Sequence, residues 1–84
     1  MQPIHELLNR IHWDKDFAQA NFMIGFYDRV EEHIIRKSLK EVYFDKSDHY
    51  FFHFHDDEDE EHSVPLHRIK EVFRNGELIW HREH

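Results

Sequence analysis

Apolar residues recur along the 84-residue chain first with helical and then with strand-like spacing. Near the N-terminus they follow intervals of three and four residues: Ile4, Leu7, Leu8 and Ile11. This stripe predicts a helix that packs one face on a core and ends at Trp13-Asp14. We expect residues 15–20 to form a polar connection that Phe17 anchors.

From residue 21 the apolar residues alternate instead, as in a β-strand. Both faces of the stretch 21–30 are apolar, with Phe22, Ile24 and Phe26 on one and Met23, Gly25 and Tyr27 on the other. Two apolar faces predict a central strand, and Gly25 indicates a bulge or the close approach of another segment. A second strand is expected at 33–37.

A strand at 50–55 is the most aromatic part of the chain. Its alternation predicts two faces, Tyr50, Phe52 and Phe54 in the core and Phe51, His53 and His55 opposite. The runs 39–45 (LKEVYFD) and 69–75 (IKEVFRN) are similar, and each precedes a turn candidate, at 46–48 and at Gly76. This similarity suggests one strand–turn–strand unit that is used twice.

The stretch 64–82 contains Asn75-Gly76 between two apolar runs. Asn-Gly is typical of a two-residue type I′ hairpin, because both central residues need positive φ. Such a turn would give three cross-strand pairs: Arg74–Glu77, Phe73–Leu78 and Val72–Ile79. The alternative is a helix that begins at Ser63 and ends on Gly76. Since β-branched and aromatic residues flank the turn on both sides, we favour the hairpin.

Together these elements predict a single α+β domain over residues 1–84. The N-terminal helix would pack on a twisted, mostly antiparallel sheet of about five strands, either open or a half-closed barrel. The length is near the lower limit for an independent hydrophobic core.

Six consecutive acidic residues, Asp56–Glu61, supply most of the net charge of −7. We expect this run to be a solvated loop, since like charges repel one another. The rest of the chain is close to neutral, which excludes a nonspecific duplex-binding protein but permits a local basic site. Ten histidines make the total charge depend on pH near neutrality.

The chain has no cysteine, which excludes disulfides and thiolate metal sites and fits a reducing cytoplasm. The N-terminus lacks the pattern of a signal peptide, and no apolar stretch approaches the length of a membrane span. We therefore expect a cytoplasmic protein without a membrane partner.

His67 and Arg68 are the most distinctive polar pair. Pro65 fixes the backbone just before them, so their side chains project from a defined position. An imidazole and a guanidinium supply donors suited to a phosphate, and the guanidinium can bind two oxygens at once. The alternative is that Arg68 pairs with Glu71 or Asp28 and that His67 is merely exposed.

Further cationic and aromatic candidates stand at the ends of predicted elements. Arg10 ends the helix and Asp28-Arg29 closes the first strand, where Asp28 could hold Arg29 or Arg68 in position. Trp80 could stack a nucleotide base. The alternatives are a plain surface role for Arg29 and a core tryptophan beneath the helix for Trp80.

Metal and catalytic motifs are weak. His53 and His55, with His49 in the same alternation, could hold a transition metal, but no spacing supplies a third ligand, so half-exposed surface residues are favoured. The acidic run lacks the glycine and spaced ligands of a calcium loop. There is no Gly-rich phosphate loop, nucleophile elbow or helical metal motif. The sequence therefore predicts no catalytic residues, metal or other cofactor.

Three blocks resemble a known family: LLNRIHWD (7–14), IGFYDRV (24–30) and, within 64–82, VPLHRIKEV with NGELIWHR. They occur in the order typical of short proteins that carry the RNA cyclic-group end recognition domain (domain of unknown function 504). The resemblance implies binding of RNA ends with a 2′,3′-cyclic phosphate and makes His67 and Arg68 the phosphate contacts. It adds the remaining motif positions as candidates for the same surface: Asn9, Arg10, Asp28, Arg29 and Trp80. The acidic run departs from the family pattern and would repel RNA unless it points away from the bound end.

We therefore expect a non-catalytic module that binds single-stranded RNA termini in RNA repair or processing, with Trp80 or Tyr27 stacking the last base. RNA-repair or processing enzymes are then the expected protein partners. Two alternatives stay open. One is a metal-free phosphodiesterase or RNA-processing enzyme that uses His67 with a second histidine, and the other is a protein-interaction module without its own ligand.

Overall fold

The structure, a computed structural model, describes residues 3–45, 47–48 and 50–83. Lys46 of the first turn candidate and His49 of the histidine row lie outside the described residues. The elements follow in this order: α1 (Ile4–Trp13), α2 (Lys15–Ala18), β1 (Phe22–Asp28), β2 (His33–Ser38), the 3₁₀ turn η1 (Leu39–Glu41), β3 (Val42–Tyr43), β4 (Phe51–His55), β5 (Glu61–Pro65), the 3₁₀ turn η2 (Leu66–Arg68), β6 (Ile69–Arg74) and β7 (Glu77–His81).

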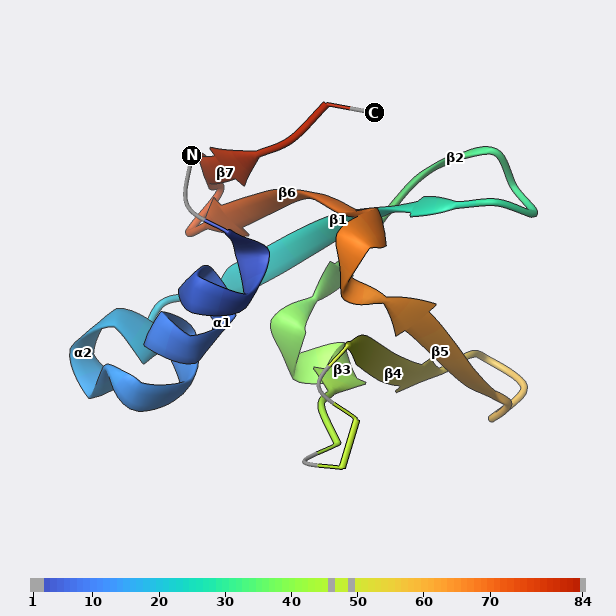
Figure 1. Cartoon of the computed structure of the whole chain (residues 1–84), viewed down its shortest axis with the longest axis horizontal. Helices are drawn as coiled ribbons and strands as arrows, with labels where there is room; N and C mark the ends of the chain where they lie inside the picture. The colour runs from blue at the N-terminus through green and yellow to red at the C-terminus, as the bar shows by residue number, and fades with distance from the viewer. Residues whose placement is uncertain (1–2, 46, 49, 84) are drawn as a thin grey trace.

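The α+β class is confirmed, but the strands form two sheets rather than one. Over the described residues, seven strands form an antiparallel sheet of order β2-β1-β6-β7 and a second of order β3-β4-β5, and neither closes into a barrel. Figure 1 shows the two sheets one above the other, with η2 leading from β5 to β6. No helix in the described part of the chain is long and apolar enough to cross a membrane.

The split into two sheets occurs where the chain leaves regular strand geometry. At the end of β2 the Ser38 hydroxyl accepts a hydrogen bond from Lys40 N–H and begins η1. At the end of β5, Pro65 lacks a backbone N–H and cannot continue the ladder, and η2 follows. Each 3₁₀ turn therefore carries the chain from one sheet to the other.

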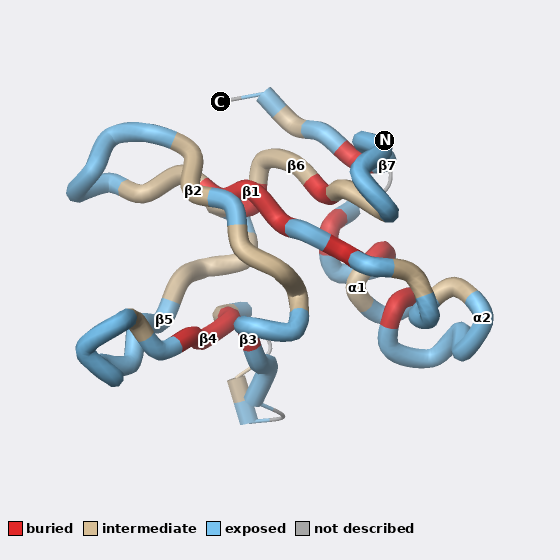
Figure 2. The backbone as a smooth tube through the Cα atoms, turned by 180° about the vertical axis from the view of Figure 1, so that it is seen from behind, coloured by how far each residue is buried: buried red, intermediate tan, exposed pale blue. Residues whose placement is uncertain are grey.

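β1 is central, as its two apolar faces predict, because it pairs with both β2 and β6. Ile24 and Phe26 are almost fully buried, and the Phe26 ring meets the rings of Phe52 and Phe54 of the second sheet at 5.2 and 5.8 Å. Figure 2 shows buried segments along β1 and β4, where the sheets face each other. The aromatic residues of the two predicted strands therefore join the sheets into one core.

The predicted N-terminal helix is confirmed as α1, which ends before Asp14. Its apolar stripe is buried at Ile4, Leu7 and Ile11, with Leu8 half-buried. The polar connection predicted over 15–20 contains the short helix α2, which Asp14 caps by accepting a hydrogen bond from Phe17 N–H. Phe17 packs against the core as expected.

Gly25 marks both a shift in register and a close approach. The pairing of β1 with β6 shifts between Gly25 and Phe26. A Cβ built at Gly25 would collide with the side chain of Glu71 on β6. Glycine is therefore required here by the neighbouring strand and not by its backbone torsions.

The hairpin over 69–81 is confirmed, and the helical alternative is excluded. Asn75 and Gly76 have φ of 51° and 83°, as a type I′ turn demands. The pairs Arg74–Glu77 and Phe73–Leu78 form as predicted. The third pair was wrong: a register shift between Val72 and Phe73 puts Trp80 opposite Val72, so that Trp80 enters the core.

Two further predictions were wrong. The similar runs 39–45 and 69–75 do not repeat a unit, because Leu39–Glu41 is the 3₁₀ turn η1 whereas Ile69–Glu71 is strand. Tyr50 lies just before β4, beyond the core, and is 78% exposed. His53 on the opposite face is buried, since the Tyr43 ring covers it at 5.2 Å.

Candidate functional site

His67 and Arg68 lie on η2, at the junction of the two sheets. Pro65 precedes the turn with φ of −61°, so the backbone enters it in the direction that proline fixes. His67 is exposed and Arg68 is half-buried. Within the ranges that the structure describes, neither side chain has a hydrogen bond or ion pair. Both are available to a ligand.

Glu71 and Asp28, the alternative partners of Arg68, are occupied elsewhere. The Glu71 carboxylate accepts a hydrogen bond from Arg36 Nε at 2.7 Å. The Asp28 carboxylate accepts from the N–H groups of Val30 and Glu31 and so closes the β1–β2 turn. Asp28 therefore holds a turn together, and it orients neither Arg29 nor Arg68.

Arg82 holds η2 in shape. Its Nη2 donates to three backbone carbonyls, those of Leu66 at 3.3 Å, His67 at 2.9 Å and Ile69 at 2.9 Å. Its guanidinium carbon also lies 5.1 Å from the centre of the Trp80 ring. In the sequence Arg82 stands out only as a neighbour of Trp80, because bonds from a side chain to distant carbonyls leave no spacing pattern.

The predicted cationic residues do not converge on one point. Arg29 follows Asp28 in the turn at the end of β1. Arg10 lies at the other end, with its guanidinium 4.0 Å from the Phe17 ring, which packs on Phe22 at the start of β1. The six residue steps of β1 separate these places by roughly 20 Å. His67 and Arg68 lie toward the Arg29 end, since β6 begins opposite Phe26.

Arg10 belongs instead to a second cationic cluster. The guanidinium carbon of Arg74 lies 4.9 Å from the same Phe17 ring, and Arg74 Nε is buried without a hydrogen-bond partner. Arg10 Nε also lies 3.9 Å from Oδ2 of Asp14. Asn9 is exposed on the same helix. Arg74 was not among the sequence candidates, because its position by Phe17 depends on the pairing of β6 with β1.

Trp80 is 6% exposed and belongs to the core. A base needs an open ring face to stack on, so the prediction that Trp80 stacks a base was wrong, and the alternative of a core tryptophan is correct. The register shift in the hairpin is the physical cause, since it turns Trp80 inward. Tyr27, the other stacking candidate, is half-buried on β1.

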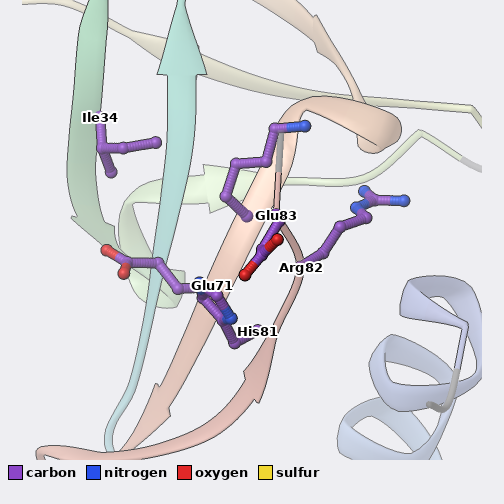
Figure 3. A pocket seen from close by; sticks show the side chains of 6 residues that line it. Ile34, Glu71, His81, Arg82 and Glu83 are labelled. Atoms are coloured by element: carbon purple, nitrogen blue, oxygen red, sulfur yellow. The ribbon is translucent and has the colours of Figure 1, made fainter.

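Arg82 also lines a surface pocket of about 440 Å³. Its lining residues carry both signs of charge: Ile34, Lys70, Glu71, His81, Arg82 and Glu83. Figure 3 shows Glu71 turned toward Ile34 of β2, with Arg82 pointing away from it. Glu71 and Glu83 offset the positive charges of Lys70 and Arg82, so this pocket is poorly suited to an anion.

The histidines of the second sheet bind neighbouring side chains. His53 Nδ1 lies 2.8 Å from Ser63 Oγ, and His55 Nε2 lies 3.9 Å from the Glu61 carboxylate. Glu61 also accepts a hydrogen bond from the Tyr43 hydroxyl, which raises the pKa of Tyr43. The two histidines of the predicted His-x-His pair therefore act as polar partners within the sheet.

Within the described ranges, the group that could hold a divalent metal is Asp56, Glu60 and His62, whose ligand atoms lie within 4.8 Å of one another. Asp56 already accepts hydrogen bonds from His62 Nε2 at 2.7 Å and from the N–H groups of Glu60 and Glu58. The bond from His62, followed by those backbone bonds, lowers the pKa of Asp56. These contacts account for the cluster as the closure of the β4–β5 loop.

The acidic run lies at the far end of β5 from η2 (Figure 1). Residues 56–60 form the β4–β5 loop, whereas Glu61 begins β5. The loop is therefore one residue shorter than the sequence predicted. The five residue steps from Glu61 to Leu66 span roughly 16 Å. The condition that the acidic loop point away from His67 and Arg68 is therefore met.

Comparison with known proteins gives one family. The family model of the MJ1316 RNA cyclic group end recognition domain matches residues 1–82. No curated protein and no solved structure matches the chain. The match covers both sheets, α1 and η2, and it agrees with the resemblance of the three sequence blocks. The chain therefore belongs to the MJ1316 RNA cyclic group end recognition domain family.

Proposed function

We propose that this domain binds RNA 3′ ends that carry a 2′,3′-cyclic phosphate and that His67 and Arg68 grip the terminal phosphate. The name of the family points to recognition of cyclic-group RNA ends. The observation that carries the proposal for this chain is the pair on η2, with His67 exposed, Arg68 half-buried and neither side chain in an ion pair within the described ranges. A guanidinium and an imidazole without partners on a fixed turn offer N–H donors that are suited to a small anion.

The chemistry of the pair matches this ligand. A 2′,3′-cyclic phosphate has two non-bridging oxygens that share one negative charge, and the guanidinium fork of Arg68 can donate to both. The His67 imidazole adds a further N–H donor. Arg82 stays bound to the carbonyls of η2 and keeps both donors in position.

The other predicted residues take different parts. Arg29, at the same end of β1, would add charge near the bound end. Arg10 lies with Phe17 near the start of β1, so Arg10 and its helical neighbour Asn9 would contact a nucleotide farther from the terminus. Asp28 acts through the turn that carries Arg29.

Fluorescence anisotropy with short single-stranded RNAs tests the proposal. Three RNAs of the same sequence would end in a 2′,3′-cyclic phosphate, a 3′-phosphate or a 3′-hydroxyl group. We expect the cyclic phosphate end to bind most tightly and Arg68→Ala to weaken it by about 10- to 150-fold, as for a charged hydrogen bond worth about 1.5–3 kcal/mol.

Lys15→Ala is the matched control, since it removes one positive charge from an exposed position on α2, away from η2. This variant should bind like the wild type. Equal affinity for all three RNA ends, or equal losses in Arg68→Ala and Lys15→Ala, would overturn the proposal.

The alternative of a phosphodiesterase requires a second imidazole within reach of His67. In the described part of the chain, the His67 ring has no contact with another histidine, and His53, His55 and His62 have partners on the second sheet. Chromatography of the cyclic-phosphate RNA after incubation tests this alternative. We expect the end group to be unchanged, and hydrolysis that His67→Ala abolishes would establish an enzyme.

We further propose that the domain serves RNA repair or processing and meets the enzymes of those pathways on the same RNA ends. A partner whose binding survives the loss of both His67 and Arg68 would favour the protein-interaction alternative instead.

A further inference from the structure

Tyr50 is the residue that stands out beside η2. It is 78% exposed, although Phe52 and Phe54, which share its alternation on the strand, are buried. Among the described residues its ring has no aromatic, cationic or hydrogen-bonded partner. Its burial was predicted and did not occur, so its exposure calls for another account.

A backbone hydrogen bond holds Tyr50 next to η2, the turn that carries His67 and Arg68. Leu66 N–H donates to the Tyr50 carbonyl at 2.8 Å. The bond lies just beyond the last pair of β4 and β5, Phe51 with Pro65, where η2 begins. The backbone of the exposed Tyr50 therefore lies beside that of Leu66, the residue that precedes His67 and Arg68.

We infer that Tyr50 stacks the base of the terminal nucleotide whose cyclic phosphate His67 and Arg68 bind. The inference rests on the proposed function and deepens it. The cyclic phosphate and the base belong to the same nucleoside, so a ring next to the phosphate contacts is where the base arrives. Trp80, the residue expected in this role, is buried in the core opposite Val72 of β6.

The inference also defines the class of RNA end. A base that stacks on a side chain cannot at the same time be paired and stacked at the end of a duplex. The ligand is therefore an unpaired terminal nucleotide, as in a single strand or a 3′ overhang. Because every base has an aromatic face, the preference among the four bases should be weak.

Binding of a cyclic-phosphate RNA to Tyr50 variants tests the inference. Tyr50→Ala should weaken binding by about 5- to 150-fold, the change that corresponds to one base–aromatic stack. Tyr50→Phe, which keeps the ring and removes the hydroxyl, should bind within about twofold of the wild type. Trp13→Ala is the control, since Trp13 is an exposed aromatic residue (76%) at the C-terminal end of α1 and has no backbone hydrogen bond to η2 in the described ranges.

A second pair of ligands gives a readout that a merely structural role would not change. A cyclic phosphate on a 3′ overhang should bind the wild type more tightly than the same group on a blunt duplex. This difference should disappear in Tyr50→Ala. Thermal unfolding of each variant checks that the fold is retained.

The outcomes separate the two claims. If Arg68→Ala loses binding while Tyr50→Ala does not, the stacking inference is overturned and the proposed function stands. If the wild type does not distinguish the cyclic phosphate end at all, both are overturned. Loss in Tyr50→Ala that Tyr50→Phe shares would also contradict stacking, because it would show that the hydroxyl and not the ring is needed.

Discussion

Individual side chains set the chemistry of this domain mainly through the partners that they already have. Glu71 binds Arg36 and Asp28 binds its own turn, so the two carboxylates that were the alternative partners of Arg68 do not neutralise it. The same network explains why Gly25 has no side chain, since Glu71 fills the space above it.

Gly25→Ala should therefore destabilise the fold by about 1–3 kcal/mol, the usual cost of overpacking a filled space. Urea unfolding measures this loss. In a Glu71→Ala background the added methyl group meets no carboxylate, so the same substitution should cost much less, as a double-mutant cycle would show. An equal cost in both backgrounds would mean that the collision with Glu71 is not the cause.

Asp56 gives a prediction about pH. Its pKa is lowered in the fold from an ordinary value of 3.8, chiefly by the hydrogen bond from His62. A lowered pKa means that the contribution to stability is complete above that ordinary value and is lost as pH falls through the pKa of the folded state.

Asp56→Asn should therefore be less stable than the wild type at about pH 7, and the difference should shrink toward about pH 3. Urea unfolding over this pH range is the measurement. Asp57→Asn, the next residue of the same exposed loop, serves as the control and should show no such trend. A difference that is constant with pH would contradict the role of the Asp56 charge.

At the scale of elements, η2 depends on a residue from another strand. Arg82 follows β7, and it donates to three carbonyls in and beside the turn that carries His67 and Arg68. The turn is therefore tied to the end of the last strand, which explains how so short an element can hold a binding pair.

Arg82→Met should lower the free energy of unfolding by about 1.5–3 kcal/mol, since the charged donor is lost and its acceptors are left unpaired. It should also weaken binding of the RNA end, because η2 loses its support. Arg82→Lys keeps a charged donor, so its stability and its affinity for the RNA end should lie between those of the wild type and of Arg82→Met. Full stability of Arg82→Met together with lost binding would indicate that Arg82 contacts the RNA directly.

The sequence predicted the elements whose pattern is local. The α1 stripe, the two-faced β1 and the Asn75-Gly76 turn each follow from residues close together in the chain. The register shift at Val72 was not predictable, because a bulge depends on how the strand meets its neighbour. This one shift changed Trp80 from a candidate for stacking into a core residue.

At the scale of the whole molecule, the arrangement of the sheets separates the acidic loop from the candidate site. The sequence predicted the pair His67-Arg68 but not the split into two sheets, which depends on how Ser38 and Pro65 end their strands. It also did not predict Tyr50 as an exposed neighbour of the site, since that neighbour relation is a pairing between distant segments.

Because the loop begins roughly 16 Å from η2, its charges should matter little to a short RNA end. The screening length at physiological salt is about 8 Å. Neutralising Asp57, Glu58 and Asp59 together should change the affinity for a cyclic-phosphate end by less than about twofold at that salt. A much larger gain in anisotropy titrations would mean that the loop faces the bound RNA.

The central claim is that the pair on η2 recognises the cyclic phosphate. Its most direct test is a nuclear magnetic resonance titration of the isotope-labelled protein with a dinucleotide that ends in a 2′,3′-cyclic phosphate, beside the same dinucleotide with a 3′-hydroxyl end. The account predicts that resonances of His67, Arg68 and Tyr50 shift with the cyclic phosphate and much less with the hydroxyl. Shifts centred on Arg10 and Phe17, or identical shifts with both dinucleotides, would contradict it.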